Sequence, residues 1–118
     1  MNTSLPTNDF IAHSTALEAA TIVVNLARRL PPRLNSIADQ IIRSANSVHA
    51  NLAEGNGRAG KDRIYHFRIA YASAKEVDSH LCLLMNLNVI DIDQTRHTMQ
   101  LFDQVRAMTW RLINSRSR

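Results

Sequence analysis

Residues that break helices are few in this sequence and fall at only a few places. All three glycines lie between residues 55 and 60, and two of the three prolines are the adjacent pair Pro31 and Pro32. Glycine and proline are the residues that most disfavour a helix interior. The chain therefore consists mainly of long segments that contain no helix-breaking residue.

Apolar residues recur in these segments at intervals of three and four, which is the spacing of one helix face. They predict helices over about 9–30, 32–55, 61–87 and from 91 onward, with Thr7, Asn8 or Asp9 capping the first and a capping box at Asp91 starting the fourth. The first helix is expected to bury Ala16, Leu17, Ala20, Val23, Val24, Ala27 and Leu30. The third is expected to bury Phe67, Ala70, Ala74, Val77, Leu81 and Leu84.

The four predicted helices are of similar length and the loops between them are short. This pattern predicts an all-α protein with an antiparallel up-down-up-down four-helix bundle. Residues 9–114 are expected to form the bundle, 1–8 a flexible N-terminal segment and 115–118 a basic C-terminal tail.

The glycine stretch GNGRAGKD, residues 55–62, matches two phosphate-binding patterns, G-x-G-x-x-G and G-x-x-x-x-G-K. Both motifs need a strand before the loop, whereas the preceding SANSVHANLAE has the periodicity of a helix. Asp62 also stands where the second motif needs Ser or Thr. We therefore expect a turn in which Gly55 ends the second helix in the left-handed conformation, and no nucleotide cofactor.

Charge is unevenly distributed along the chain, whose formal net charge is +4. Residues 54–75 carry five basic residues against two acidic ones, and residues 104–118 carry four arginines and no acid. An antiparallel bundle brings both stretches to one end, where they predict contacts to RNA or other nucleic acid through backbone phosphates. The predicted contact residues are Arg58, Lys61, Arg63, Arg68, Arg106, Arg111, Arg116 and Arg118. The alternative is a protein-interaction adaptor whose charge maintains solubility.

The third helix carries a second apolar line, on the side opposite its core face. It comprises Tyr65, Ile69, Leu83 and Leu87, with Ala72 between them. One helix cannot bury two faces in a single small bundle, so the pattern predicts a homo-oligomer. Trp110 and Leu101 of the fourth helix are expected to add to this surface.

Catalytic and metal-binding patterns are not found. The five histidines lack metal-ligand spacing, and the single cysteine, Cys82, is expected to be packed between core leucines. The sequence thus predicts no enzyme, no cofactor and no metal. With one cysteine, no signal peptide and no run of about 20 apolar residues, we expect a cytoplasmic protein that does not bind membranes.

The segment SANSVHANLAEGNGRAGKDRIYHFRIAYASAKEVDSHLCLLMNLNVI resembles the 23S rRNA intervening-sequence protein family. In the second helix and the turn, the family pattern S-I-P-x-N-I-A-E-G matches at Ser47, Asn51, Ala53, Glu54, Gly55 and Gly57. In the third helix the matches are Phe67, Ile69, Ala70, Ser73, Glu76, Leu87 and Ile90. The chain departs at His49, where the family commonly has proline.

The resemblance covers about residues 9–114, and its specific part is 44–90. It implies a non-enzymatic bundle assembled as a pentamer, and related accessory proteins bind RNA and a reverse transcriptase. It also marks a structural motif of Asn51, Glu54, Gly55, Ser73 and Glu76, whose polar members we expect to form hydrogen bonds between helices.

Overall fold

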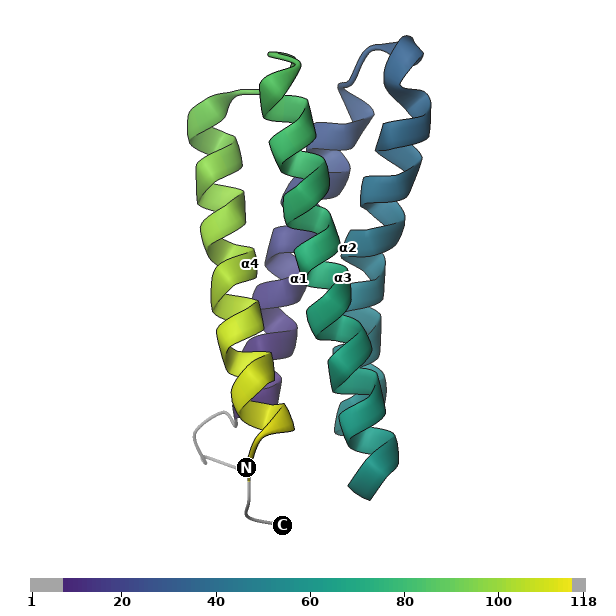
Figure 1. The fold of residues 1–118 in the computed structure, drawn as a ribbon, viewed down its shortest axis with the longest axis vertical. Coiled ribbons are helices and arrows are strands. Elements are labelled where there is room, and N and C mark those ends of the chain that lie inside the picture. Colours follow the sequence, from purple (N-terminus) through teal and green to yellow (C-terminus); the bar gives the residue numbers. More distant parts are fainter. Residues whose placement is uncertain (1–7, 116–118) are drawn as a thin grey trace, which may run out of the picture.

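The computed structural model describes residues 8–115 as four α-helices and one short 3-10 turn. The helices are α1 (Asn8–Arg28), α2 (Asn35–Asn56), α3 (Gly60–Asn86) and α4 (Ile92–Ile113), and the turn η1 is Pro32–Leu34. Each helix packs against the next, and α1 packs against α4. Successive helices run in opposite directions (Figure 1). Because α1 also packs against α4, the four helices form a closed bundle. The predicted all-α fold is confirmed.

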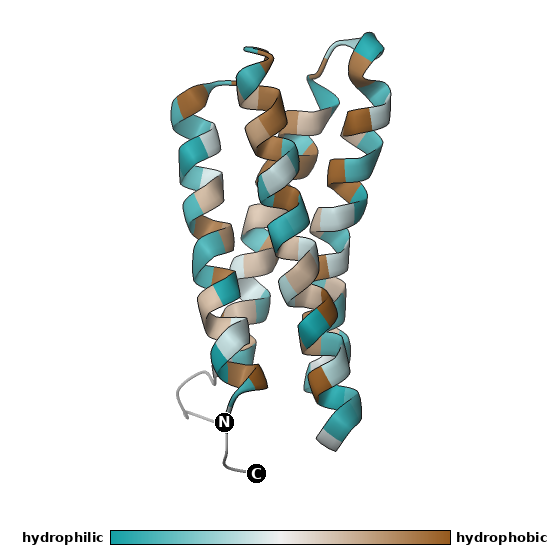
Figure 2. Cartoon of the chain, viewed as in Figure 1, coloured by the Kyte–Doolittle hydropathy of each residue, from teal (hydrophilic) through white to brown (hydrophobic). Residues whose placement is uncertain are grey.

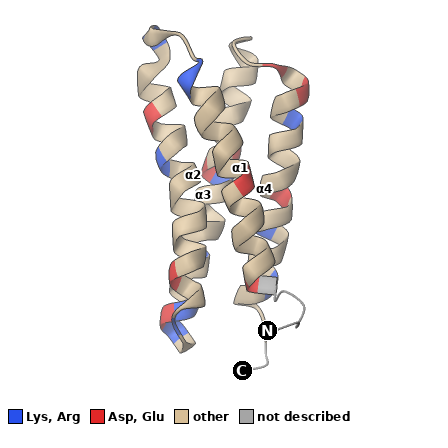
Figure 3. Cartoon of the chain, turned by 180° about the vertical axis from the view of Figure 1, so that it is seen from behind, with Lys and Arg blue, Asp and Glu red and all other residues tan. Residues whose placement is uncertain are grey.

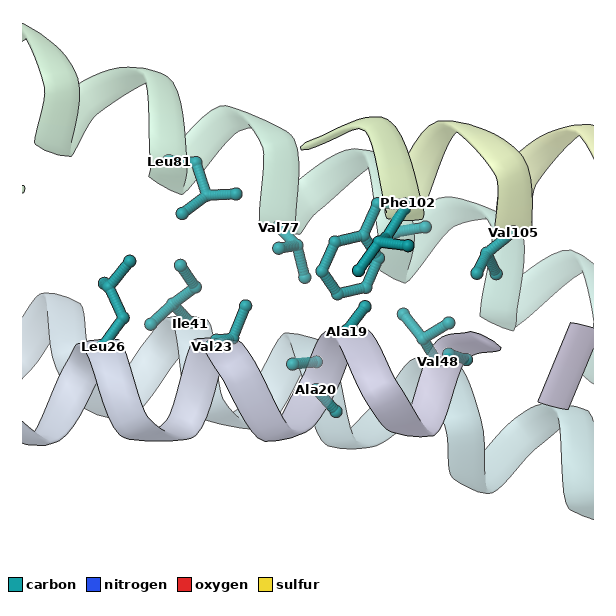
Figure 4. Packing of buried hydrophobic residues seen from close by; sticks show 14 of the residues in the cluster. Ala19, Ala20, Val23, Leu26, Ile41, Val48, Val77, Leu81, Phe102 and Val105 are labelled. Atoms are coloured by element: carbon teal, nitrogen blue, oxygen red, sulfur yellow. The ribbon is translucent and has the colours of Figure 1, made fainter. Parts of the chain in front are cut away.

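A continuous apolar core runs along the bundle axis and receives side chains from all four helices. Along α4 in Figure 2, hydrophobic segments recur between hydrophilic ones, as expected for a helix with one buried face. Val23 of α1, Val77 of α3 and Phe102 of α4 point into the same interior in Figure 4. The predicted α3 seam is confirmed, because its six residues are all fully buried: Phe67, Ala70, Ala74, Val77, Leu81 and Leu84.

The predicted core face of α1 is partly wrong. Leu17 is 45% exposed, whereas Ala12, Ala19 and Leu26 are buried. Apolar residues surround most of α1, so its sequence contains little information about which side meets the bundle. The neighbouring helices decide this instead.

The start of α4 follows the predicted capping chemistry. Asp91 precedes the helix, and its carboxylate accepts a hydrogen bond of 2.7 Å from the backbone N–H of Gln94. This bond satisfies one of the amide groups that have no partner inside the helix. For α1 the proposed cap Thr7 lies outside the described residues.

The glycine turn differs from the sequence expectation. Gly55 is not a left-handed cap; it is a buried residue inside the last turn of α2, which continues to Asn56. Gly57 follows the helix with a φ of −91°, and the left-handed glycine is Gly60, with a φ of 62°, at the start of α3. A side chain at Gly55 would collide with Phe67, so close packing between helices requires glycine there.

The helix α1 is the described segment that is long and apolar enough to cross a membrane by length and composition. An 18-residue window within Asp9–Arg28 has a mean hydropathy of 1.4, although polar residues such as Glu18 and Asn25 interrupt its apolar residues. A core helix of a bundle passes the same test. The buried alanines and valine on α1 show that it serves here as a core helix.

Candidate assembly surface and basic bundle end

The six predicted basic residues that the structure describes lie toward one end of the bundle. The end of α2, the start of α3 and the end of α4 all meet there (Figure 1). Figure 3 shows that acidic segments lie among the basic ones at the α2–α3 corner. The availability of each basic group therefore depends on its ion pairs.

Arg58 lies in the turn between α2 and α3 and binds two carboxylates. Its guanidinium group is 2.8 Å from Glu54 and 3.1 Å from Asp62. The hydrogen bond from Arg58, together with its positive charge, lowers the pKa of Glu54. Arg58 is thus partly neutralised in a three-residue cluster on the surface.

Arg63 ties α3 to α1 and to the end of α2. It pairs with Asp9 at 3.3 Å, donates a hydrogen bond of 3.1 Å to the carbonyl of Gly55 and lies 4.6 Å over the ring of Phe67. These contacts hold three helices together. Arg63 is therefore a structural residue in this bundle.

Arg106 joins α4 to α3 through Asp78 and also pairs with Asp103 on its own helix. Burial raises the pKa of Asp78, and the guanidinium of Arg106 opposes that rise. One carboxylate oxygen of Asp78 is buried without a hydrogen-bond partner in the structure. The positive charge of Arg106 therefore partly offsets the cost of burying the carboxylate of Asp78.

The remaining predicted basic residues of the described chain are Lys61, Arg68 and Arg111. All three are exposed, and none forms an ion pair with any residue from 8 to 115. Arg116 and Arg118 lie outside the described residues. Three of the six predicted contact residues that the structure describes thus have no ion pair within residues 8–115.

The second apolar line of α3 is largely on the surface. Tyr65 is 60% exposed, Leu83 43% and Leu87 45%, while Ile69 is half-buried. Leu101 does not extend this line, because it is buried in the core. Trp110 is 55% exposed but lies in a hollow between α3 and α4, beside Tyr71.

A chain of polar contacts joins α2 to α3. Ser73 donates a hydrogen bond of 2.8 Å to the hydroxyl of Ser47, which also accepts one of 3.1 Å from Asn51. The other end of the Asn51 amide is 2.9 Å from a ring nitrogen of His66. The expected bonds between helices are confirmed for Ser73 and Asn51.

The other two polar residues of the motif behave differently. Glu54 pairs with Arg58 beyond the end of its helix, and Glu76 contacts His80 one turn along α3 at 3.4 Å. Both carboxylates are exposed, and neither forms a direct hydrogen bond between α2 and α3. His66 was not predicted as a member of this network, although it lies seven residues before Ser73 and hence on the same face of α3.

The glycine turn and the titratable residues do not form an enzyme-like cluster in the described chain. The turn borders an open hollow of about 460 Å³, in which Arg58 is already paired with the two carboxylates of the lining, Glu54 and Asp62. Among residues 8–115, no three His, Cys, Asp or Glu side chains are grouped as metal ligands would be. Cys82 is exposed, contrary to expectation, because it lies on the solvent side of α3 between the core positions Leu81 and Leu84.

The fold places the chain in the class of small all-α helical bundles. Its polar and charged residues are spread over the helices and over the ends of the bundle. The chain belongs to the 23S rRNA-intervening sequence protein family, which it matches over residues 8–111. The expected family is thereby confirmed.

A solved structure supports the same fold. It is a protein of unknown function from the S23 ribosomal protein family of Bacteroides thetaiotaomicron, with 25% sequence identity and a TM-score of 0.84. The similarity covers 92% of this chain and 100% of the other. No curated protein matches the sequence.

Proposed function

We propose that this chain is a non-enzymatic protein that assembles with copies of itself and binds RNA or other nucleic acid through backbone phosphates. The observation that carries the proposal is the set of three exposed cations, Lys61, Arg68 and Arg111, that no described carboxylate neutralises. Lys61 and Arg68 are seven residues apart, so they lie on one side of α3, about 10 Å apart along the axis. Both cations can therefore face the same phosphate backbone.

Assembly would multiply this modest charge. Burying an exposed leucine or tyrosine is favourable by about 1.5–3 kcal/mol, and α3 exposes Tyr65, Leu83 and Leu87 in one line. Packing this face against another copy would repeat the cations around the assembly, and resemblance to the family suggests five copies. A cytoplasmic setting belongs to the same proposal, because the single exposed thiol of Cys82 suits a reducing compartment.

The phosphate contacts are tested by measuring RNA affinity at several salt concentrations. The variant Lys61→Gln with Arg68→Gln should flatten the plot of log affinity against log salt by roughly 1.4–1.8, which corresponds to two lost contacts. The control Arg28→Gln with Arg29→Gln removes two exposed charges at the opposite end and should leave the slope unchanged. Equal effects of both variants would contradict a binding surface at this end.

Self-assembly is tested by light scattering on Ile69→Glu with Leu83→Glu. We expect a folded species of smaller mass, because Leu83 is exposed and the half-buried Ile69 lies on the same apolar line of α3, away from the core. Ile11→Glu with Leu17→Glu is the matched control, since these exposed residues lie on α1. If the control dissociates and the α3 variant does not, the assembly surface lies on α1 instead.

The second candidate is a protein-interaction adaptor that does not bind nucleic acid. It is favoured by the ion pairs of Arg58, Arg63 and Arg106, which engage half of the described basic set. In that case the charges maintain solubility, and the apolar face of α3 binds a protein. The absence of RNA binding at low salt, in a protein that still assembles, would support this candidate over the first.

A further inference from the structure

An aromatic hollow lies on the outer side of the bundle between α3 and α4. It has a volume of about 520 Å³ and is open to solvent. Its lining is Tyr71, Asp103, Arg106, Ala107, Trp110 and Arg111. Trp110, the only tryptophan of the sequence, is 55% exposed there, and Tyr71 is half-buried.

Basic residues surround these two rings. Arg68 and Lys75 lie three residues before and four residues after Tyr71, so they flank it on the same side of α3. Both are exposed, as is Arg111 beside Trp110. Arg106 is shared between Asp103 and Asp78, so the positive charge beside the hollow comes from Arg111, Arg68 and Lys75.

This hollow is distinct from the apolar line that we assign to assembly. On α3, Ser73 faces α2, to which it is hydrogen-bonded, whereas Asp78 faces α4 through Arg106. At about 100° per residue, Tyr65 and Leu83 are each about 120° around the helix from Tyr71. The apolar line and the hollow therefore lie on different sides of α3.

We infer that this hollow binds single-stranded nucleic acid, with a base stacked on Trp110 beside Tyr71 and the adjoining phosphates on Arg111, Arg68 and Lys75. Exposed aromatic rings within a cationic groove are the combination that holds unpaired bases, because every base has a face that stacks. A duplex offers its phosphates but keeps its base faces stacked inside. The inference rests on the proposed nucleic-acid binding and specifies which form of nucleic acid is preferred.

The lone tryptophan allows a direct test. An oligouridine of about 12 nucleotides should quench the fluorescence of Trp110 on binding, and an RNA duplex of similar length should not. With fluorescein-labelled RNA and anisotropy as the readout, Trp110→Leu should weaken oligouridine binding roughly 5- to 150-fold and change duplex binding less than about twofold. Trp110→Phe should retain most of the affinity.

The matched control is Phe10→Leu, which changes another exposed aromatic residue at the same end of the bundle. It should bind both RNAs as the unmodified protein does, and circular dichroism should show each variant to be helical. Tyr71→Leu gives a second measurement of the same site through the labelled RNA.

The outcomes separate this inference from the function on which it rests. If Trp110→Leu weakens oligouridine and duplex equally, or weakens neither, base stacking is wrong while phosphate binding stands. If inorganic polyphosphate quenches Trp110 as strongly as oligouridine does, the hollow is an anion site and the inference is overturned. If neither RNA binds the unmodified protein at low salt, both proposals fail.

Discussion

Replacing Gly55 by valine tests the contact between α2 and α3 at the glycine turn. A Cβ atom at residue 55 would lie 2.5 Å from Cε1 and 2.7 Å from Cδ1 of Phe67. Carbon atoms that are not bonded pack at about 3.5–4.0 Å, so the ring or the helix would have to move by about 1 Å.

The surroundings of Phe67 oppose that movement. The ring is fully buried, and the guanidinium of Arg63 lies over it, 4.6 Å from the centroid. Overpacking of this kind costs about 1–3 kcal/mol. Valine and glycine differ by only a few tenths of a kcal/mol in helix propensity, so Gly55→Val should lower the free energy of unfolding by about 1–3 kcal/mol.

The assay is urea unfolding followed by circular dichroism, at one fixed protein concentration because assembly shifts apparent stability. Gly57→Val is the control: its Cβ would meet only the carbonyl of Glu54 at 3.7 Å, an ordinary contact, and the position is exposed. We expect a change within about 0.5 kcal/mol there.

A double-mutant cycle isolates the contact itself. In the Phe67→Leu background the ring is gone, so Gly55→Val should cost less by about 0.5–3 kcal/mol. The reasoning is refuted if Gly55→Val is as stable as Gly57→Val. It is also refuted if its cost is the same whether residue 67 is phenylalanine or leucine.

Three further changes have defined expectations. Asp91→Ala removes the cap of α4 and should cost about 1 kcal/mol in urea unfolding. Ser73→Ala removes the hydrogen bond to Ser47 and should cost about 1 kcal/mol, whereas the exposed Ser79→Ala should be nearly neutral. The pKa of His49 is lowered mainly by burial. Its imidazole therefore binds a proton more readily in the unfolded chain than in the folded one. Stability should therefore fall as the pH drops through the ordinary histidine range, and His49→Gln should lessen that fall in urea midpoints.

The candidate binding surface shows why residue types alone were insufficient. The sequence identified the basic residues, and the antiparallel bundle brings the described ones toward one end. It did not reveal that Arg63 pairs with Asp9 or that Arg106 pairs with Asp78, because these partners are 54 and 28 residues apart. Likewise, Trp110 was expected to join the apolar line of α3, but the rotation of α4 places it beside Tyr71.

The helices, their order and the buried seam of α3 were all predictable from the sequence. These features depend on local signals: the three-and-four spacing of apolar residues, the positions of glycine and proline, and the carboxylate of Asp91 before α4. Tertiary structure decided which side of α1 is buried, so that Leu17 is exposed, and why residue 55 is glycine. The physical reason is that a helix forms from contacts within a few residues, whereas burial and ion pairing depend on the faces that neighbouring helices present.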